Sequence, residues 1–218
     1  MTVFRNVILA ALWGAVVGCA GSGPAETAPV PEAAPTPAEQ AGVGMRLPHT
    51  EADIHFMSGM IPHHAQAIVM ARLAEPNGAS GPVQILAGRI INAQIDEIAT
   101  AQRWLRDRGQ PVPEAKPGPM KMKMNGVEHE MLMPGMLTDE QMKQLEQARG
   151  ADFDWLFITS MIQHHKGAVD MVKQLFATPG AAQDERVFKF ASDVNVDQTT
   201  EINRMLKLLA TLPSGRSP

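Results

Sequence analysis

The chain contains one helix-length motif twice, and this repeat restricts its fold more than any other feature. In each copy an Asp, a Phe, a Met-Ile pair, a His-His pair, an Ala and a Met follow one another at the same spacing. The first copy is Asp53, Phe56, Met60, Ile61, His63, His64, Ala67 and Met70, and the second is Asp154, Phe157, Met161, Ile162, His164, His165, Ala168 and Met171. This spacing is typical of helix faces. A second helix with a Gln-x-x-Glu pattern follows each copy, so the sequence predicts a four-helix bundle from a helix hairpin duplicated once.

Capping and breaking residues indicate where the helices begin and end. Thr50 with Asp53 and Thr138 with Gln141 are typical capping pairs, and Gly109 is a typical stop. The expected helices cover residues 50–75, 82–108, 138–150, 152–177 and 182–212. Residues 110–137 are expected to form a long Met-rich crossover loop, and no segment alternates with period two over a useful length, so no sheet is expected. The predicted fold class is all-α: a ferritin-like four-helix bundle with that loop and one short extra helix.

The segment before the bundle carries the signals of an exported lipoprotein. Arg5 precedes an apolar stretch from residue 7 to residue 17, which is too short to cross a bilayer as a helix but suits a signal peptide. The small residues that follow end at Cys19, the one Cys of the chain, and resemble a bacterial lipobox. The alternative is an ordinary signal peptide with an incidental Cys. The predicted domains are a lipoprotein signal peptide at 1–18, a disordered Pro/Ala-rich tether at 19–48 and the bundle at 49–212, with repeats at about 50–109 and 151–212.

Lipidation of Cys19 would anchor the protein to a bacterial membrane, with its domain in the periplasm or outside the cell. The folded domain would then contain no thiol, so it would form neither a disulfide nor a thiolate metal site. The formal net charge of −4 provides no general attraction to nucleic acid or to an anionic membrane surface. We therefore expect membrane contact through the lipid anchor only and no nucleic-acid partner.

Each copy of the motif places two imidazoles and two thioethers on adjoining faces of its helix. Imidazole binds copper, zinc, nickel or iron, whereas thioether suits Cu(I). The predicted metal ligands are Met60, His63, His64, Met70, Met161, His164, His165 and Met171. Gln94 with Glu97, and Gln198 with Glu201, on the partner helices are candidate hydrogen-bond acceptors for these histidines, and the alternative is that they form ordinary polar helix faces. The alternative is structural: the Met residues fill the core, and the histidines form hydrogen-bonded layers with Asp53 and Asp154 at the bundle centre.

The crossover loop contains a second group of Met and His residues. This group consists of Met120, Met122, Met124, His129 and Met131. Alternating Met in a flexible segment is not typical of core packing and resembles the Met-rich motifs of periplasmic copper proteins, so we predict transient Cu(I) binding here. The alternative is a cover whose Met side chains lie over the end of the bundle, which we expect for Met133 and Met136.

The sequence patterns of common catalytic classes are missing. No Glu-x-x-His pair is present, which argues against a di-iron oxidase. The sequence contains neither a Gly-x-Ser-x-Gly motif nor a Cys nucleophile after the signal peptide, which argues against a hydrolase. It also contains no Gly-rich phosphate-binding loop. We therefore predict a protein without covalent catalysis.

The doubled Phe-x-x-x-Met-Ile-x-His-His-x-x-Ala motif, with Met-Pro-Gly-Met-Leu-Thr at 133–138 between its copies, resembles the bacterial family called domain of unknown function 305. The resemblance covers residues 50 to about 210. It implies a ferritin-like four-helix fold and a role in copper binding and resistance, because some periplasmic members bind copper through Met and His. The predicted function is an extracytoplasmic copper-binding protein that sequesters or transfers copper, with Cu(I) favoured, and acts with a copper-transfer partner protein or as a homo-oligomer. The alternative is a structural or interaction module without metal.

Overall fold

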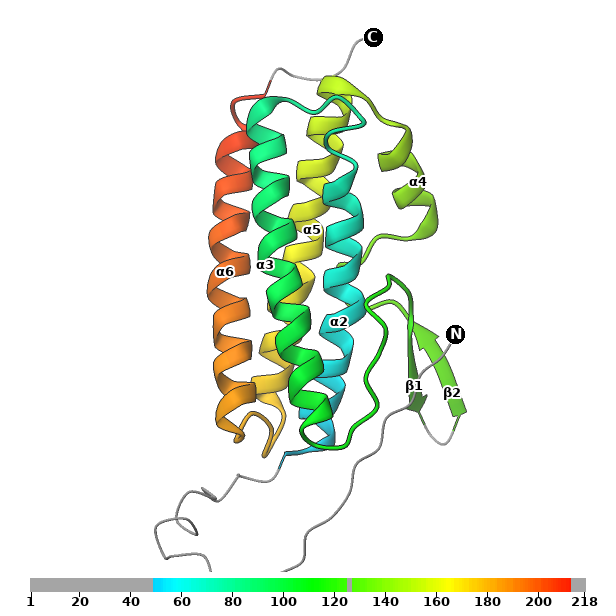
Figure 1. Cartoon of the computed structure of the whole chain (residues 1–218), viewed down its shortest axis with the longest axis vertical. Helices are drawn as coiled ribbons and strands as arrows, with labels where there is room; N and C mark the ends of the chain where they lie inside the picture. Colours follow the sequence, from blue (N-terminus) through cyan, green and yellow to red (C-terminus); the bar gives the residue numbers. More distant parts are fainter. Residues whose placement is uncertain (1–48, 125–126, 213–218) are drawn as a thin grey trace, which may run out of the picture. The chain divides into compact units, whose positions relative to one another are not determined.

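A computed structural model of the chain describes residues 49–124 and 127–212, with only the backbone described at 121–124 and 127–129. The four long helices are α2 (Glu51–Arg72), α3 (Gly81–Arg106), α5 (Gly150–Ala177) and α6 (Glu185–Leu209). They lie side by side, and the short α4 (Asp139–Gln147) packs against α2 and α5 (Figure 1). The prediction of a helical fold with one short extra helix is confirmed.

The predicted signal peptide, lipidation site and tether fall on residues 1–48, outside the described part of the chain, so they stay predictions. None of the described helices combines the length and the apolar character that crossing a membrane requires.

Side-chain caps fix where the helices begin. The Thr50 hydroxyl accepts a hydrogen bond from the Asp53 backbone N–H at 3.2 Å, and the Asp53 carboxylate accepts one from the Thr50 N–H at 2.7 Å. Thr138 and Gln141 form the same reciprocal pair at the start of α4. Each such cap stabilises its helix by about 1 kcal/mol. Both predicted capping pairs are therefore confirmed.

The repeated Asp residues tie the two helix hairpins together. Oδ1 of Asp53, at the start of α2, accepts a hydrogen bond from the Ala182 N–H in the turn before α6, at 2.7 Å. Asp154, near the start of α5, accepts one from the Ser80 N–H just before α3, at 3.1 Å. Each Asp is buried and binds the turn of the opposite copy. The alternative that places these Asp residues in a layer with the histidines is therefore wrong, because they lie toward the ends of their helices.

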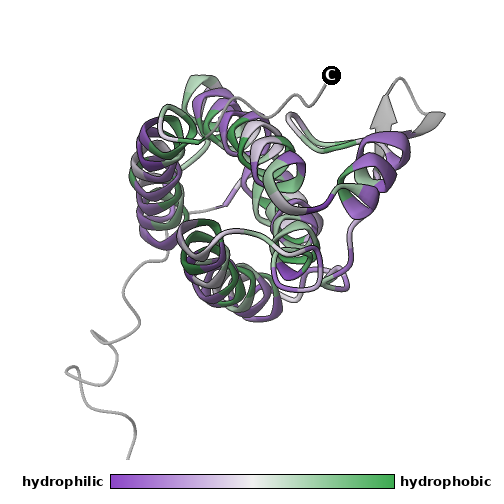
Figure 2. Ribbon diagram, turned by 90° about the horizontal axis from the view of Figure 1, so that it is seen from above, coloured by the Kyte–Doolittle hydropathy of each residue, from purple (hydrophilic) through white to green (hydrophobic). Residues whose placement is uncertain are grey.

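The core consists of two apolar clusters that follow one another along the helices. Seen from above, the four long helices surround a common interior (Figure 2). One cluster includes Phe56, Met57, Met60, Trp104, Met171 and Phe190. The other includes Met70, Val83, Phe153, Phe157, Met161 and Met205. Burial of each such side chain contributes about 1.5–3 kcal/mol, so the two clusters hold the middle of the bundle in place from both sides.

The crossover contains a two-stranded β-hairpin, so the expectation of no sheet is wrong for this segment. β1 (Met120–Met124) pairs antiparallel with β2 (Val127–Met131), and Met122 lies opposite His129. The sequence does alternate here, and an Asn-Gly dipeptide between two alternating runs is a strong hairpin signal. A hairpin of this size is only marginally stable by itself. Packing of Met120 against the first apolar cluster supplies the support that the local pattern does not reveal.

The turn at residues 133–137 packs directly on α2 and α5. A Cβ at Gly167 of α5 would overlap the carbonyl oxygen of Pro134, so only glycine fits at this contact. Gln66 of α2 accepts a hydrogen bond from the Leu137 N–H at 2.7 Å and donates one to the Leu137 carbonyl at 2.9 Å. Both Met residues of the turn are buried. The turn thus covers the bundle as predicted, but it lies along the side formed by α2 and α5 rather than over an end.

Candidate metal centre

Four buried histidines form a layer across the middle of the bundle. His63 and His64 come from α2, His164 and His165 come from α5, and each has a relative exposure of 0%. The ring centroids of His63 and His164 lie 3.9 Å apart. Within each adjacent pair the centroids are 5.9 and 6.3 Å apart, because neighbouring helix residues point about 100° apart. The pairing of α2 with α5 therefore brings both copies of the motif together in one layer.

Glutamates of the partner helices contact one histidine of each pair. Nε2 of His165 lies 2.6 Å from Oε2 of Glu201 on α6 and donates to it. Nε2 of His64 lies 3.0 Å from Oε2 of Glu97 on α3, although the two groups are poorly aligned for a hydrogen bond. The predicted contacts between the glutamates and the histidines are thus present. The carboxylates lie on the Nε2 side of these two rings, so Nδ1 points away from them, as in many metal-binding histidines.

The other two histidines are neutral at pH 7. Burial, together with the charge of the nearby His64, lowers the pKa of His63 to about 3. Burial, with the charge of His63, also lowers the pKa of His164 well below its ordinary value. Nε2 of His63 lies 3.0 Å from the carbonyl oxygen of Pro134, which only accepts, so the proton is on Nε2 and the lone pair on Nδ1. Neutral imidazole is the form that binds metal ions.

Buried ring nitrogens gather in this layer without hydrogen-bond partners among the described residues. They include Nδ1 of all four histidines and Nε2 of His164. Oε1 of Gln94 on α3 and Oε1 of Gln198 on α6 also have no partner there. A buried polar atom left unpaired costs about 1–3 kcal/mol, so several such atoms at one level of a bundle indicate more than packing. Nitrogen lone pairs are the donors that copper and zinc accept, so the residues present fit a metal ion.

The histidines and carboxylates alone do not form a complete metal-binding site. Within the described parts of the chain, no three or more His, Cys, Asp or Glu side chains are placed to hold a metal ion together. The predicted thioethers divide between the two sides of the layer. Met60 and Met171 belong to one apolar cluster, Met70 and Met161 to the other, and all four are buried. Each side of the layer therefore has one thioether from each copy of the motif.

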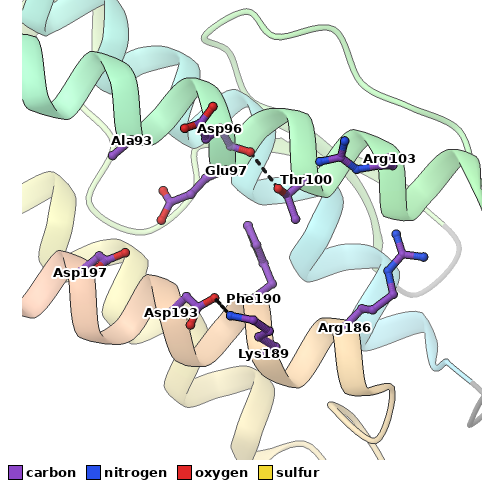
Figure 3. Close-up of a pocket in the computed structure, with 10 residues that line it drawn as sticks. All are labelled: Ala93, Asp96, Glu97, Thr100, Arg103, Arg186, Lys189, Phe190, Asp193 and Asp197. Carbon is purple, nitrogen blue, oxygen red and sulfur yellow. Dashed lines mark hydrogen bonds and ion pairs between the residues drawn. The ribbon is translucent and has the colours of Figure 1, made fainter.

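A cleft between α3 and α6 leads toward the histidine layer. It has a volume of about 520 Å³, and Figure 3 shows Glu97 pointing from α3 into the space above Asp193 and Asp197 of α6. Burial raises the pKa of Asp197, and the charges of Glu97 and Asp193 raise it further. Four carboxylates line the cleft together with three basic side chains, Arg103, Arg186 and Lys189, and Glu97 connects it to the histidine layer because this residue also contacts His64. The sequence did not reveal this cleft, because an Asp on a helix surface usually marks only a solvated face.

The second predicted Met/His group is described only at its ends. Met120 is partly buried against the first apolar cluster, whereas Met131 is 47% exposed. The side chains of Met122, Met124 and His129 lie outside the described part, so their role in metal binding stays a prediction.

Comparison with known proteins identifies relatives of the bundle. A family model described as domain of unknown function (DUF305) matches residues 53–209. A candidate secreted DUF305 protein from Streptomyces coelicolor is 28% identical, with a TM-score of 0.61 over 73% of this chain and 91% of that one. A DUF305 fragment from Deinococcus radiodurans is 27% identical, with a TM-score of 0.61 over 76% of this chain and 99% of that one. No curated protein matches the chain significantly in sequence.

The structure of CopM is also similar. In its Cu(I)-bound form CopM is 28% identical, with a TM-score of 0.54 over 72% of this chain and 95% of CopM. CopM has also been solved in a Cu(II)-bound and a silver-bound form.

Proposed function

The chain belongs to the DUF305 family, and we propose that it is an extracytoplasmic protein that binds copper at the histidine layer of its bundle. It sequesters the ion or passes it to another protein, and it performs no covalent catalysis. The observation that carries this proposal is the group of buried imidazoles whose Nδ1 atoms have no hydrogen-bond partner among the described residues. Metal coordination would give those lone pairs a partner, while the contacts with Glu97, Glu201 and the turn hold the rings in orientation.

The ligands around the layer favour copper over other metals. Zinc and iron are held well by histidine but gain little from thioether, whereas Cu(I) binds both. Met60 and Met171 on one side, and Met70 and Met161 on the other, supply thioethers. CopM, which this chain matches over nearly the whole length of CopM, has been solved with copper and with silver, another soft monovalent ion. These observations support Cu(I) as the main cargo.

A Cu(I) titration of the full-length chain without oxygen, against a chromophoric chelator, tests the proposal. H63Q/H164Q removes two ring ligands while keeping polar side chains, and its Cu(I) affinity should fall by more than about 100-fold. The matched control is H49Q, because His49 lies against Trp104 outside the layer and its loss should not change the affinity. Unchanged affinity in H63Q/H164Q would overturn the proposal. A structural module would instead show no copper binding in the wild type and only a loss of stability in the variant.

Export and lipid attachment form the second part of the proposal. The apolar stretch before Cys19 suits a signal peptide, and one relative is a candidate secreted protein. A metal site built from His and Met without thiol also suits an oxidising compartment. Cells that express the protein should incorporate labelled fatty acid into it, and C19A should abolish the label and release the protein from membranes. Labelling that persists in C19A would contradict the lipid anchor.

A further inference from the structure

Three methionine side chains converge on one glycine of α2. A Cβ at Gly59 would lie 3.0 Å from Sδ of Met133, 3.1 Å from Sδ of Met120 and 3.4 Å from Cε of Met171. These residues come from the turn at 133–137, from β1 and from α5. Three distant segments of the chain thus bring two sulfur atoms and one thioether methyl group to one buried point against α2.

Gly59 is explained by this close approach and not by backbone conformation. It lies inside a helix and is absent from the glycines with positive φ, so any residue fits its backbone geometry. Glycine in a helix interior costs about 1 kcal/mol relative to alanine. The second copy has Ser160 at the equivalent position. The first copy therefore accepts a weaker helix former where a side chain would crowd two sulfur atoms.

The methionine cluster borders an open pocket with soft, neutral donors. The pocket has a volume of about 370 Å³, and its walls include Met133, Met171, Met131 and His55. Burial lowers the pKa of His55, so this ring is neutral at pH 7. No Asp, Glu, Lys or Arg is among the described residues that line the pocket. Hard cations need oxygen ligands with charge, so this chemistry selects a soft monovalent cation. A methionine cluster that only filled the core would not need donors around an opening.

We propose that Met120 and Met133, with Met171 shared between this site and the histidine layer, form an outer site that takes up Cu(I) before the ion reaches the layer. This inference rests on the proposed function, since both sites carry the same cargo. The two sites are joined through the chain itself. Met133 precedes Pro134, whose carbonyl accepts from His63, and Met171 lies about two helical turns from His164 on α5. An ion bound at the outer site is therefore held by the same turn and helix that position the layer.

Titration of the full-length chain with Ag(I), counted by native mass spectrometry, tests the outer site. Ag(I) is a soft monovalent probe that does not change oxidation state under these conditions. M120L/M133L keeps the size of both side chains and removes two sulfur atoms. It should lose one Ag(I) equivalent and keep the equivalent bound by the histidine layer. The matched control is M205L, because Met205 is buried in the opposite apolar cluster, and this variant should keep both equivalents.

The outcomes separate this inference from the proposed function. Wild-type Ag(I) stoichiometry and affinity in M120L/M133L would overturn the outer site alone. Full binding in H63Q/H164Q would overturn the histidine layer alone. A readout that needs no variant is the NMR spectrum of wild-type protein labelled at its methionine methyl groups. Ag(I) should shift the signals of Met120, Met133 and Met171 and leave that of Met205 in place, and unshifted signals from the first three would overturn the outer site.

Discussion

Lowering the pH from 7 to 5 should destabilise the metal-free protein through two buried histidines. The pKa of His63 is about 3 in the folded chain, and that of His164 lies well below its ordinary value of 6.5. In the unfolded chain both rings titrate near 6.5, so below that pH the unfolded state binds protons that the native state excludes. Stability is therefore full above pH 6.5 and falls as the pH decreases toward the folded pKa. From pH 7 to pH 5 each ring should remove about 2 kcal/mol, a large part of an ordinary 5–15 kcal/mol.

Urea denaturation with a chelator present, followed by circular dichroism at both pH values, measures this loss. The pH dependence is the informative quantity, because H63Q/H164Q is expected to be less stable at every pH. That variant should lose most of the dependence between pH 7 and pH 5, whereas H49Q should keep it. An equal change in the wild type and in H63Q/H164Q would refute the conclusion that these two rings are buried in their neutral form. A wild type of equal stability at both pH values would refute it as well.

Three further experiments test separate contacts. G167A should detach the turn from α5 and lower both the urea midpoint and the Cu(I) affinity. The control G88A should stabilise α3 by about 0.5–1 kcal/mol, because a Cβ at Gly88 meets nothing within 4 Å. Equal stability of the two variants would contradict the packing of the turn. D53N should cost about 1–3 kcal/mol in thermal unfolding, because Asp53 binds both its own cap and the opposite hairpin, and a cost near zero would contradict that double role. If a cation enters through the cleft between α3 and α6, D193N/D197N should slow Cu(I) association in stopped-flow mixing and weaken its salt dependence without changing the number of ions bound. An unchanged rate would exclude this cleft as the route.

The helices could be predicted because their signals are local. Thr50 and Thr138 cap their helices through residues three positions away, which a single sequence displays directly. The repeat predicts that both His-His pairs belong to bundle helices, but whether the two copies meet in one layer depends on how α2 packs against α5. The Gln-x-x-Glu repeat offered both residue types as acceptors, and in the structure Glu97 and Glu201 contact His64 and His165.

The remaining parts of the site depend on contacts that carry no local signal. The acceptor for His63 is the backbone carbonyl of Pro134, and every residue has such a carbonyl. The repeated Asp53 and Asp154 suggested chemistry, yet their partners are backbone N–H groups in turns far along the chain. Met133 was expected only to cover the bundle, and its place beside Met120 depends on how the crossover folds back onto Gly59.

The crossover also explains some of the differences between the two copies of the motif. Three of the unlike pairs have a member that contacts the crossover: Gly59 and Ser160, Pro62 and Gln163, and Gln66 and Gly167. In these pairs Gln66 binds Leu137, Gln163 donates to the Gly135 carbonyl at 3.3 Å, and Gly167 and Gly59 make room for the turn and its methionine. The crossover lies on only one side of the two-fold repeat, so residues that contact it differ from their equivalents in the other copy. The histidines face each other across the repeat and are the same in both copies. The same asymmetry gives Nε2 of His63 a partner in the turn and leaves both ring nitrogens of His164 free of hydrogen bonds within the described residues. Unequal ligand availability in the two copies therefore arises from the turn, while α2 continues through Pro62 as an unbroken helix.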